Sequence, residues 1–578
     1  MNTAFLTVFQ SEKVWNFYQS EKVRGFFQSV KVWALPEILV CVSLVVLTAL
    51  FVSLSAGKYV NVLQQSSYKI KGLKTWLKRG GKEYKADEII TFFLAFAACC
   101  LAYFCLLSVV GLKRYFCVVP LFVCVPLYLR RIFSQKPKKK LEVTNRVKKI
   151  FAACFIISFV VLSFALLLVK ELLYSAFDSR LSGAEVLVCP LLPAFTAEIV
   201  MLAEIITSPL INAKNAKFVK RAKQKLHSLD GVIKIGVTGS YGKTTVKNIL
   251  YTVLSTKYKV LKTPESFNTP LGIAKTVENL DSSYDVFIAE MGARKRGDIK
   301  ELCEIVPIDY AVLTGVAEQH LETFGDVGEI KKEKTEILRA LSKGVAVVGV
   351  DCPMTATIDC GSVKPGVKLL KAGTDSRFNP DITCENIRIY EWGSEFTLSV
   401  DGEKARTKTK LLGKHFITDI LLAAGIAYSL GFSVAEIAAA VSIIEPIKHR
   451  MELIDCGEYF VIDDGYNSNP AGAKEALETL GVFSGTKILV TPGIVEAGKA
   501  EKSINFSFGI EAAKHCDYVI LVESPVTDYI KEGVLSAKKE KEKVFVVGSL
   551  DEAKILLPTL LSNDGVVLFE NDLPDAYL

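Results

Sequence analysis

Long apolar runs separated by basic loops fill the first third of the chain. Five of these runs are candidate membrane spans, at about 37–56, 89–111, 116–129, 150–169 and 184–206. The first, second and fourth are long enough to cross a bilayer as helices. The third is short, and the fifth contains Pro190, Pro193, Glu198 and Glu204. Charged residues inside a span usually face protein or a water-filled cavity, and Glu204 is equally compatible with a place at the membrane interface. The pattern predicts a helical transmembrane region of about five spans.

From Ser208 onward, short apolar runs alternate with helical patterns. A basic helical stretch at 214–229 leads into predicted strands at 232–237, 285–289, 310–314 and 345–350. Residues 380–411 alternate in the β manner with a turn at Gly402, and 421–430 is an alanine-rich helix. Further strands are predicted at 459–463, 487–491, 518–522, 544–547 and 566–570. This order indicates an α/β class, with a central α/β domain and a C-terminal Rossmann-like α/β domain.

We therefore expect four parts along the 578 residues: an aromatic and basic segment at 1–35, a transmembrane region at 36–207, a central domain at 208–449 and a C-terminal domain at 450–578. The first segment repeats a Gln-Ser motif every nine residues. Nine residues are two and a half helical turns, so the copies would not share one face of a helix. We assign this segment no chemistry.

Charge and composition place the chain at a membrane. The formal net charge is +8 and the mean hydropathy is +0.32, which is high for a soluble protein. The basic residues gather in two loops between apolar runs, which favours the inner face of a membrane over nucleic acid. The 14 cysteines show no metal-binding spacing, and eight of them lie in or beside apolar runs, as small buried hydrophobes do in a reducing compartment.

A glycine-rich turn at the start of the central domain predicts a phosphate-binding loop. Gly239, Ser240, Tyr241, Gly242, Lys243, Thr244 and Thr245 follow an apolar strand and open a helix. Glycines let backbone N–H groups approach phosphate, the helix N-terminus and the lysine attract anions, and a threonine hydroxyl can bind Mg²⁺. Val237 stands where the general pattern has a glycine, so the loop is a shorter variant. Because ATP is cytoplasmic, five spans with this loop inside also satisfy the positive-inside rule.

Polar residues follow several of the predicted strands, where open α/β sheets place their ligands. Glu290 follows the strand at 285–289 and could hold Mg²⁺. His320 and Lys334 come after the strand at 310–314, and Asp463 and Asp464 come after the one at 459–463. Taken alone, His320 is equally typical of a surface histidine, and the two aspartates are equally typical of a capping turn.

These residues resemble the Mur ligase family of ATP-dependent amide-forming ligases, most closely the branch that adds D-alanyl-D-alanine to UDP-N-acetylmuramoyl-tripeptide. The resemblance runs from about Gly231 to the C-terminus. It is carried by seven ordered stretches: 238–245, 263–272, 289–293, 320–336, 411–415, 449–450 and 463–469.

The resemblance implies roles for individual residues. It makes Lys243, His320, Lys334 and Arg450 catalytic, and it gives Mg²⁺ to Thr244, Glu290, His320 and an N-carboxylated Lys334. The nucleotide would contact the phosphate loop (Gly239 to Thr245), Asp419, Arg450 and Asp464. The substrate would contact Asn268, Thr269, Tyr466, Asn467 and Asn469.

Two features depart from the family. Asp419 stands where the family usually has an asparagine; it can accept a hydrogen bond from the adenine amino group, but it lacks the donor of an amide. Family members usually carry a soluble UDP-sugar-binding domain at the N-terminus, and this chain has apolar spans there instead. The amide-forming machinery therefore carries over and the identity of the acceptor does not.

The sequence thus predicts a membrane-anchored, multi-pass ligase of the cytoplasmic membrane, with ATP and Mg²⁺ as cofactors and its ligase domains in the cytoplasm. It would add an amino acid or a dipeptide such as D-alanyl-D-alanine to a muropeptide-like cell-envelope precursor, lipid-linked or UDP-linked. Two alternatives remain: a polyglutamate-type ligase, and an inactive nucleotide-binding membrane scaffold. An ATP-coupled transporter is the weakest reading, since no transport motif accompanies the loop.

Overall fold

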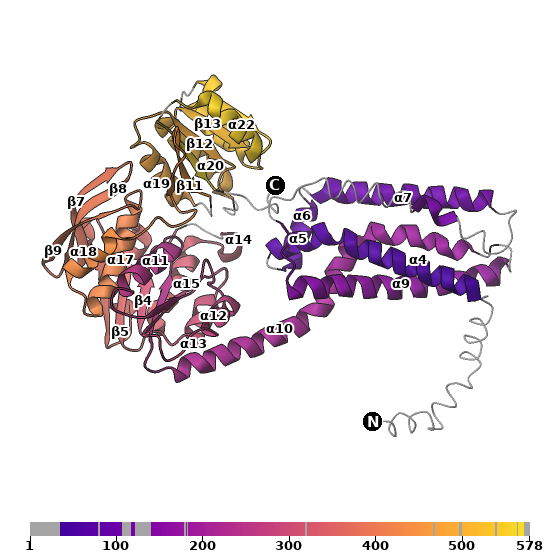
Figure 1. Cartoon of the computed structure of the whole chain (residues 1–578), viewed down its shortest axis with the longest axis horizontal. Helices are drawn as coiled ribbons and strands as arrows, with labels where there is room; N and C mark the ends of the chain where they lie inside the picture. Colours follow the sequence, from indigo (N-terminus) through magenta and orange to yellow (C-terminus); the bar gives the residue numbers. More distant parts are fainter. Residues whose placement is uncertain are drawn as a thin grey trace. The chain divides into compact units, whose positions relative to one another are not determined.

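The structure is a computed structural model that describes residues 35–66, 68–78, 81–106, 117–121, 140–177, 181, 183–317, 321–465, 469–495, 500–537, 540–562 and 564–571. The chain divides between Asn212 and Ala213 into two compact units (Figure 1). Helices make up the first unit, and two sheets with their helices make up the second.

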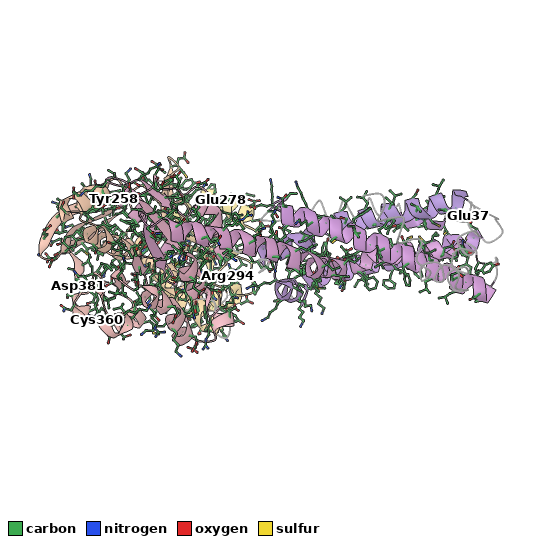
Figure 2. All side chains as sticks on the ribbon, turned by 90° about the horizontal axis from the view of Figure 1, so that it is seen from below. Glu37, Tyr258, Glu278, Arg294, Cys360 and Asp381 are labelled. Atoms are coloured by element: carbon green, nitrogen blue, oxygen red, sulfur yellow. The ribbon has the colours of Figure 1, made fainter. Side chains whose placement is uncertain are left out.

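The first unit is a bundle of long apolar helices. It contains α4 (Leu35–Ser55), α5 (Gly57–Gln65), α6 (Ile70–Lys78), α7 (Gly81–Cys105), α9 (Asn145–Phe177), the 3₁₀ helix η3 (Ala184–Phe195) and the first half of α10 (Thr196–Ser228), which continues into the second unit. Figure 1 shows α4, α7 and α9 alongside one another, and Figure 2 labels Glu37 in the first turn of α4. Pro190 and Pro193 lie within η3, where proline removes the N–H groups that an α-helix needs.

Four stretches of this unit are long and apolar enough to cross a membrane: Glu37–Gln65, Gly81–Cys105, Asn145–Phe177 and Ala184–Ser228. They correspond to four of the five predicted runs; the run at 116–129 lies outside the described residues except for 117–121. Leu101, Phe104 and Phe164 are 70%, 66% and 67% exposed. Large apolar side chains exposed along a helix bundle are typical of a surface that contacts lipid.

The charged residues of the predicted fifth span form ion pairs with neighbouring helices. Glu204 on α10 is 2% exposed and forms an ion pair with Arg146 on α9. The Ser208 hydroxyl also donates to Glu204 Oε1, at 2.9 Å. Glu198 forms an ion pair with Lys85 on α7. These contacts join three helices, which is the usual arrangement for charged side chains in such segments.

A nine-stranded mixed sheet forms the first part of the second unit, in the order β2-β3-β1-β4-β5-β6-β7-β8-β9. Its strands are β1 (Ile233–Thr238), β2 (Val260–Lys262), β3 (Val286–Glu290), β4 (Tyr310–Leu313), β5 (Gly344–Gly349), β6 (Val367–Ala372), β7 (Ile382–Tyr390), β8 (Gly393–Val400) and β9 (Glu403–Thr409). The strands from β2 to β7 are parallel, and β8 and β9 add antiparallel pairs. The predicted turn at Gly402 is confirmed, with a φ of +84°.

Helices pack on both faces of this sheet. They are α11 (Lys243–Leu254), α12 (Pro270–Val277), α13 (Asp298–Ile305), α14 (Leu321–Phe324), α15 (Val327–Ala340), α16 (Pro353–Ala356), α17 (His415–Ser429) and α18 (Val434–Ser442). The apolar faces of α11 and α17 join one core with β1, β3 and β5, while α12, α13 and α15 join a second core. Burial on both faces explains why β1 and β3 read as continuous apolar runs.

A six-stranded sheet forms the rest of the second unit, in the order β10-β11-β15-β12-β13-β14. The strands are β10 (Glu452–Asp455), β11 (Tyr459–Asp464), β12 (Lys487–Thr491), β13 (Tyr518–Val522), β14 (Val544–Val547) and β15 (Gly565–Glu570), with helices α19 (Pro470–Leu480), α20 (Glu501–His515), α21 (Thr527–Ser536) and α22 (Leu550–Leu560). All neighbours are parallel except the edge pair β10–β11. The predicted α/β class and the strands after Arg450 are confirmed.

Candidate active site

The turn between β1 and α11 takes a backbone shape that only glycine fits at two positions. Gly239 has a φ of +154° and Gly242 a φ of +73°. A Cβ atom on Gly239 would lie 1.9 Å from Thr314 Oγ1, and one on Gly242 would lie 2.5 Å from Asp419 Oδ1. The turn therefore combines left-handed backbone with close packing, and it brings the N-terminus of α11 to the carboxyl edge of the sheet. This arrangement suits an anion.

Lys243 begins α11 and folds back over the turn. Its Nζ donates to the carbonyl oxygens of Gly239 at 2.8 Å and Ser240 at 3.2 Å. Burial lowers the pKa of Lys243 to about 8, although the nearby Glu290 carboxylate acts in the opposite direction. The Lys243 ammonium group is held by two neutral carbonyl oxygens rather than by a carboxylate. It could therefore turn toward an incoming anion without breaking an ion pair.

Glu290 ends β3 and is surrounded by three hydrogen-bond donors. Thr244 Oγ1 and Lys247 Nζ each lie 2.9 Å from Glu290 Oε2, and Asn268 Nδ2 lies 3.0 Å from Oε1. Burial raises the pKa of Glu290, but the charges of Lys247 and Lys243 and these hydrogen bonds outweigh it, so the net pKa is lowered. Glu290 is thus a buried carboxylate beside the threonine hydroxyl of the phosphate loop.

Lys334 lies on α15 and is 3% exposed. Burial, assisted by the positive charge of Lys243, lowers the pKa of Lys334 to about 7. A large share of this lysine is therefore the neutral amine near neutral pH. His320, the predicted partner of Lys334, lies outside the described residues.

A cleft of about 500 Å³ opens beside the turn, and both sheets of the second unit contribute to it. Tyr241, Thr245 and Asp419 line it from the first sheet and its helices, and Arg450, Asp464 and Glu570 line it from the second. The Arg450 charge acts on the titration of Lys243, Asp419 and Asp464, so one guanidinium serves both halves of the cleft.

Asp419 is 5% exposed, and its carboxyl group lies against Gly242 of the turn. Burial raises the pKa of Asp419 well above its ordinary value, with the charge of Arg450 opposing the rise. A protonated carboxyl group has an O–H donor and an acceptor oxygen, as an amide has both functions. Burial therefore favours the form of Asp419 that has the O–H donor which an ionised aspartate would lack.

Asp464 and Glu570 stand side by side at the ends of parallel strands β11 and β15. Burial raises the pKa of Asp464 to about 6, against the charge of Arg450 and a hydrogen bond from the Met451 N–H at 3.3 Å. Glu570 is 1% exposed. Two neighbouring carboxyl groups in one cleft share protons more readily than they ionise together.

Asp463 points to a different cluster. Its Oδ2 lies 2.7 Å from His449 Nδ1, and Glu452 Oε2 accepts from the His449 N–H at 3.1 Å. His449, Glu452 and Asp463 are close enough together to hold a metal ion. Asp463 Oδ1 also accepts a hydrogen bond from the Gly465 N–H at 3.0 Å, which is the contact expected if this aspartate caps the turn that follows β11.

The predicted substrate contacts have varied positions. Asn268 binds Glu290, as described above. Thr269 caps α12 by accepting from the Gly272 N–H, and Asn469 caps α19 by accepting from the Ala471 and Gly472 N–H groups. Asn469 also lines the cleft. Tyr466 and Asn467 lie outside the described residues.

Sequence reasoning missed three residues of this site. Lys247 follows Lys243 by one helical turn, and that spacing could have placed it beside the same carboxylate. Glu570 ends the last apolar strand, so the rule that found Glu290 and Asp464 applies to it equally. Asp351 follows β5 and accepts hydrogen bonds from the Thr374 N–H at 2.9 Å and the Asp375 N–H at 3.1 Å.

Comparisons with known proteins agree with this geometry. A family profile described as the Mur ligase middle domain matches residues 237–427. A UDP-N-acetylmuramoyl-tripeptide–D-alanyl-D-alanine ligase from Mycobacterium tuberculosis (strain ATCC 25618 / H37Rv) is 32% identical over 253 residues, which are 43% of this chain and 49% of that protein. A ligase of the same name from Bacillus subtilis (strain 168) is 29% identical over 347 residues, which are 59% and 72% of the two chains.

Among solved structures, the MurF ligase from Thermotoga maritima in complex with ADP superposes with a TM-score of 0.55 and is 25% identical, covering 62% of this chain and 80% of that one. The chain spans about half the length of the first curated relatives that it matches.

Proposed function

We propose that the chain is a member of the Mur ligase family, an ATP-dependent ligase that forms an amide bond through an acyl phosphate. The observation that carries the proposal is the pair of contacts at the turn: Lys243 held over the loop by carbonyls and Thr244 bound to Glu290. The same cleft brings Arg450 to the loop from the second sheet.

The reaction divides into two steps. A carboxylate oxygen of the acceptor attacks the γ-phosphorus of ATP, the bond to the β-phosphate oxygen breaks, and ADP leaves. An amine then attacks the acyl carbon, inorganic phosphate leaves with the bonding electron pair, and the amine loses a proton to solvent or phosphate. Lys243 and Arg450 would spread the negative charge of the transferring phosphoryl group, which is the main task in such a step.

The residues beside the loop fit a Mg²⁺ ion. A carboxylate offers about four acceptor positions, and Thr244, Lys247 and Asn268 use three of those on Glu290, so one remains for a metal. Thr244 and Glu290 would hold the ion with hard oxygen ligands, and His320 and Lys334 would serve a second one. When bound, Mg²⁺ offsets the repulsion between the two anions that must meet.

We extend the proposal to an N-carboxylated Lys334. An ammonium group would repel the metal, whereas a carbamate offers oxygen ligands. Carbamate formation joins the neutral amine to CO₂ and releases one proton, so it requires an unprotonated lysine. The burial that lowers the pKa of Lys334 to about 7 supplies that form near neutral pH.

We extend the proposal to the acceptor and to the location of the enzyme, for which the support lies in the first unit. Its four apolar stretches support a multi-pass protein of the cytoplasmic membrane with the ligase unit facing the cytoplasm. The relatives named above are ligases for UDP-N-acetylmuramoyl-tripeptide and D-alanyl-D-alanine. For this chain we propose a muropeptide-like envelope precursor, UDP-linked or lipid-linked, as the carboxylate substrate and an amino acid or dipeptide such as D-alanyl-D-alanine as the amine.

The test is amine-dependent release of ADP and phosphate by the purified full chain, with the amide product identified by mass spectrometry. Lys243→Ala and Arg450→Ala should each lower the rate by about 10³-fold or more, as lost cations do in phosphoryl transfer. Lys343→Ala, which changes an exposed lysine, serves as the matched control. Absence of an amide with every muropeptide and lipid-linked acceptor would refute the proposal, and repeated addition of glutamate to its own product would identify a polyglutamate ligase instead.

A further inference from the structure

The short helix α6 presents a stripe of lysines. Lys71, Lys74 and Lys78 lie within about 60° of one another around the helix axis, at 100° per residue. All three are exposed, as are Lys69 just before the helix and Lys82 just after it. We call these five residues the α6 lysine surface. Within the described part of the chain, none of the five takes part in a recorded ion pair.

The opposite face of α6 is already packed. Leu73 is fully buried and Trp76 is 5% exposed. The Trp76 ring lies 6.1 Å from that of Tyr59 on α5 and 6.2 Å from that of Tyr84 on α7. Because this apolar face is used inside the bundle, α6 cannot insert it into a lipid layer as an ordinary interfacial helix does. Any contact of α6 with a membrane must therefore come from its charges.

The connections of α6 keep it at the membrane surface if the neighbouring stretches span the bilayer. The stretch Glu37–Gln65 ends five residues before Ile70, and Gly81–Cys105 begins three residues after Lys78. At about 3.5 Å per residue, these links reach at most roughly 18 Å and 11 Å. The helix thus stays within about 18 Å of the ends of both stretches, which is about two Debye lengths at physiological ionic strength.

We propose that the α6 lysine surface binds the anionic headgroups of membrane phospholipids. The occupant follows from charge complementarity: five exposed cations, an apolar face that is unavailable, and short tethers on both sides. Each lysine near an anionic surface contributes a factor of about five in affinity. The binding is electrostatic only, so it is sensitive to salt and needs no penetration of the acyl layer. This inference rests on the membrane placement in the proposed function, but not on the ligase reaction.

The experiment titrates the full chain in zwitterionic detergent-lipid micelles with fluorescent phosphatidylglycerol or fluorescent phosphatidylcholine, and it follows anisotropy. Phosphatidylglycerol should bind at least tenfold more tightly. Lys71→Gln/Lys74→Gln/Lys78→Gln should lose at least tenfold of that affinity, whereas the same three positions changed to arginine should keep it. Lys343→Gln/Lys364→Gln/Lys368→Gln removes the same charge from exposed positions of the second unit and should change nothing.

Raising NaCl to 0.5 M should remove the preference, because the Debye length falls to about 4 Å. Inorganic phosphate at matched ionic strength should not displace the lipid. Equal binding of the two lipids, unchanged binding by the α6 glutamine variant, displacement by free phosphate, or equal loss in the second-unit variant would each overturn the inference. ADP release measured on the same samples separates the two proposals: lipid preference without any ligase product would refute only the proposed function.

Discussion

Burial of Lys334 should make the protein less stable as the pH falls. The folded chain lowers the pKa of this lysine from 10.5 to about 7. At 1.36 kcal/mol for each pH unit of difference, the cost of keeping it in the folded state is at most about 5 kcal/mol once the lysine is protonated in both states. Lys334→Met removes the charge and keeps a side chain of similar length, so it should stabilise the protein.

The sign follows from proton counting. Between pH 7 and pH 10.5 the unfolded chain carries a proton on this lysine and the folded chain does not, so stability rises with pH across that window. Above pH 10.5 the penalty is absent, and below about pH 7 it is complete. The advantage of Lys334→Met should therefore be at most about 5 kcal/mol at pH 6.5 and about 1 kcal/mol at pH 9.5.

Thermal unfolding of the full chain in CO₂-free buffers from pH 6.5 to 9.5 measures this difference. For a domain of 150–250 residues, 1 kcal/mol corresponds to about 2–4 °C, so the variant should melt about 10–20 °C higher at pH 6.5 and a few degrees higher at pH 9.5. Lys343→Met is the exposed control and should show no such trend. If Lys334 forms a carbamate, adding bicarbonate should raise the melting temperature of the unmodified chain and so reduce its difference from that of Lys334→Met. An advantage that stays constant with pH, or a variant that is less stable throughout, would refute the reasoning.

Two further predictions address the turn and the bundle. Gly242→Ala should weaken ATP binding at least tenfold, as measured with a fluorescent nucleotide, because an alanine in left-handed backbone costs about 1–2 kcal/mol and its Cβ would meet Asp419. The control is Gly431→Ala, where φ is +84° but the space around a Cβ is open, and this variant should bind ATP with normal affinity. Equal losses of affinity in the two variants would contradict the packing argument. Glu204→Ala should cost about 3 kcal/mol in micelles, seen as a lower Tm, because it leaves Arg146 unpaired. The double variant Arg146→Leu/Glu204→Leu should recover most of the lost stability, because it leaves no unpaired charge. If the double variant is as unstable as Glu204→Ala, the loss has another cause than the unpaired Arg146.

Local patterns predicted the elements that have local causes. The strand before the turn, the glycines at 239 and 242 and the helix that follows were all predicted from neighbours in sequence, because backbone conformation and phosphate affinity arise within about ten residues. The polar residues after β3 and β11 were found by the same rule, since strand ends mark the ligand edge of a parallel sheet. The sequence left open whether Glu204 of the fifth predicted run faces protein or the membrane interface, and its buried ion pair with Arg146 shows that it faces protein.

Long-range packing decided the rest. The sequence offered no way to tell that Asp419, 177 residues from Gly242, would lie against it, or that burial there would raise the pKa of its carboxyl group. Nor could the sequence predict the lowered pKa of Lys334, because a lysine acquires a pKa of about 7 only when segments packed around it remove its hydrating water.

The sequence by itself determined that this chain has long apolar helices followed by an α/β unit with a glycine-rich turn after its first strand, because periodicity, glycine and the order of elements are properties of short stretches. The tertiary structure alone decided which carboxylate meets Lys247, which strand end joins Asp464 to Glu570, and how Arg450 comes to act on both halves of the cleft. Those pairings depend on sheet order and register, and these are fixed by the burial of apolar faces contributed by segments far apart in the chain.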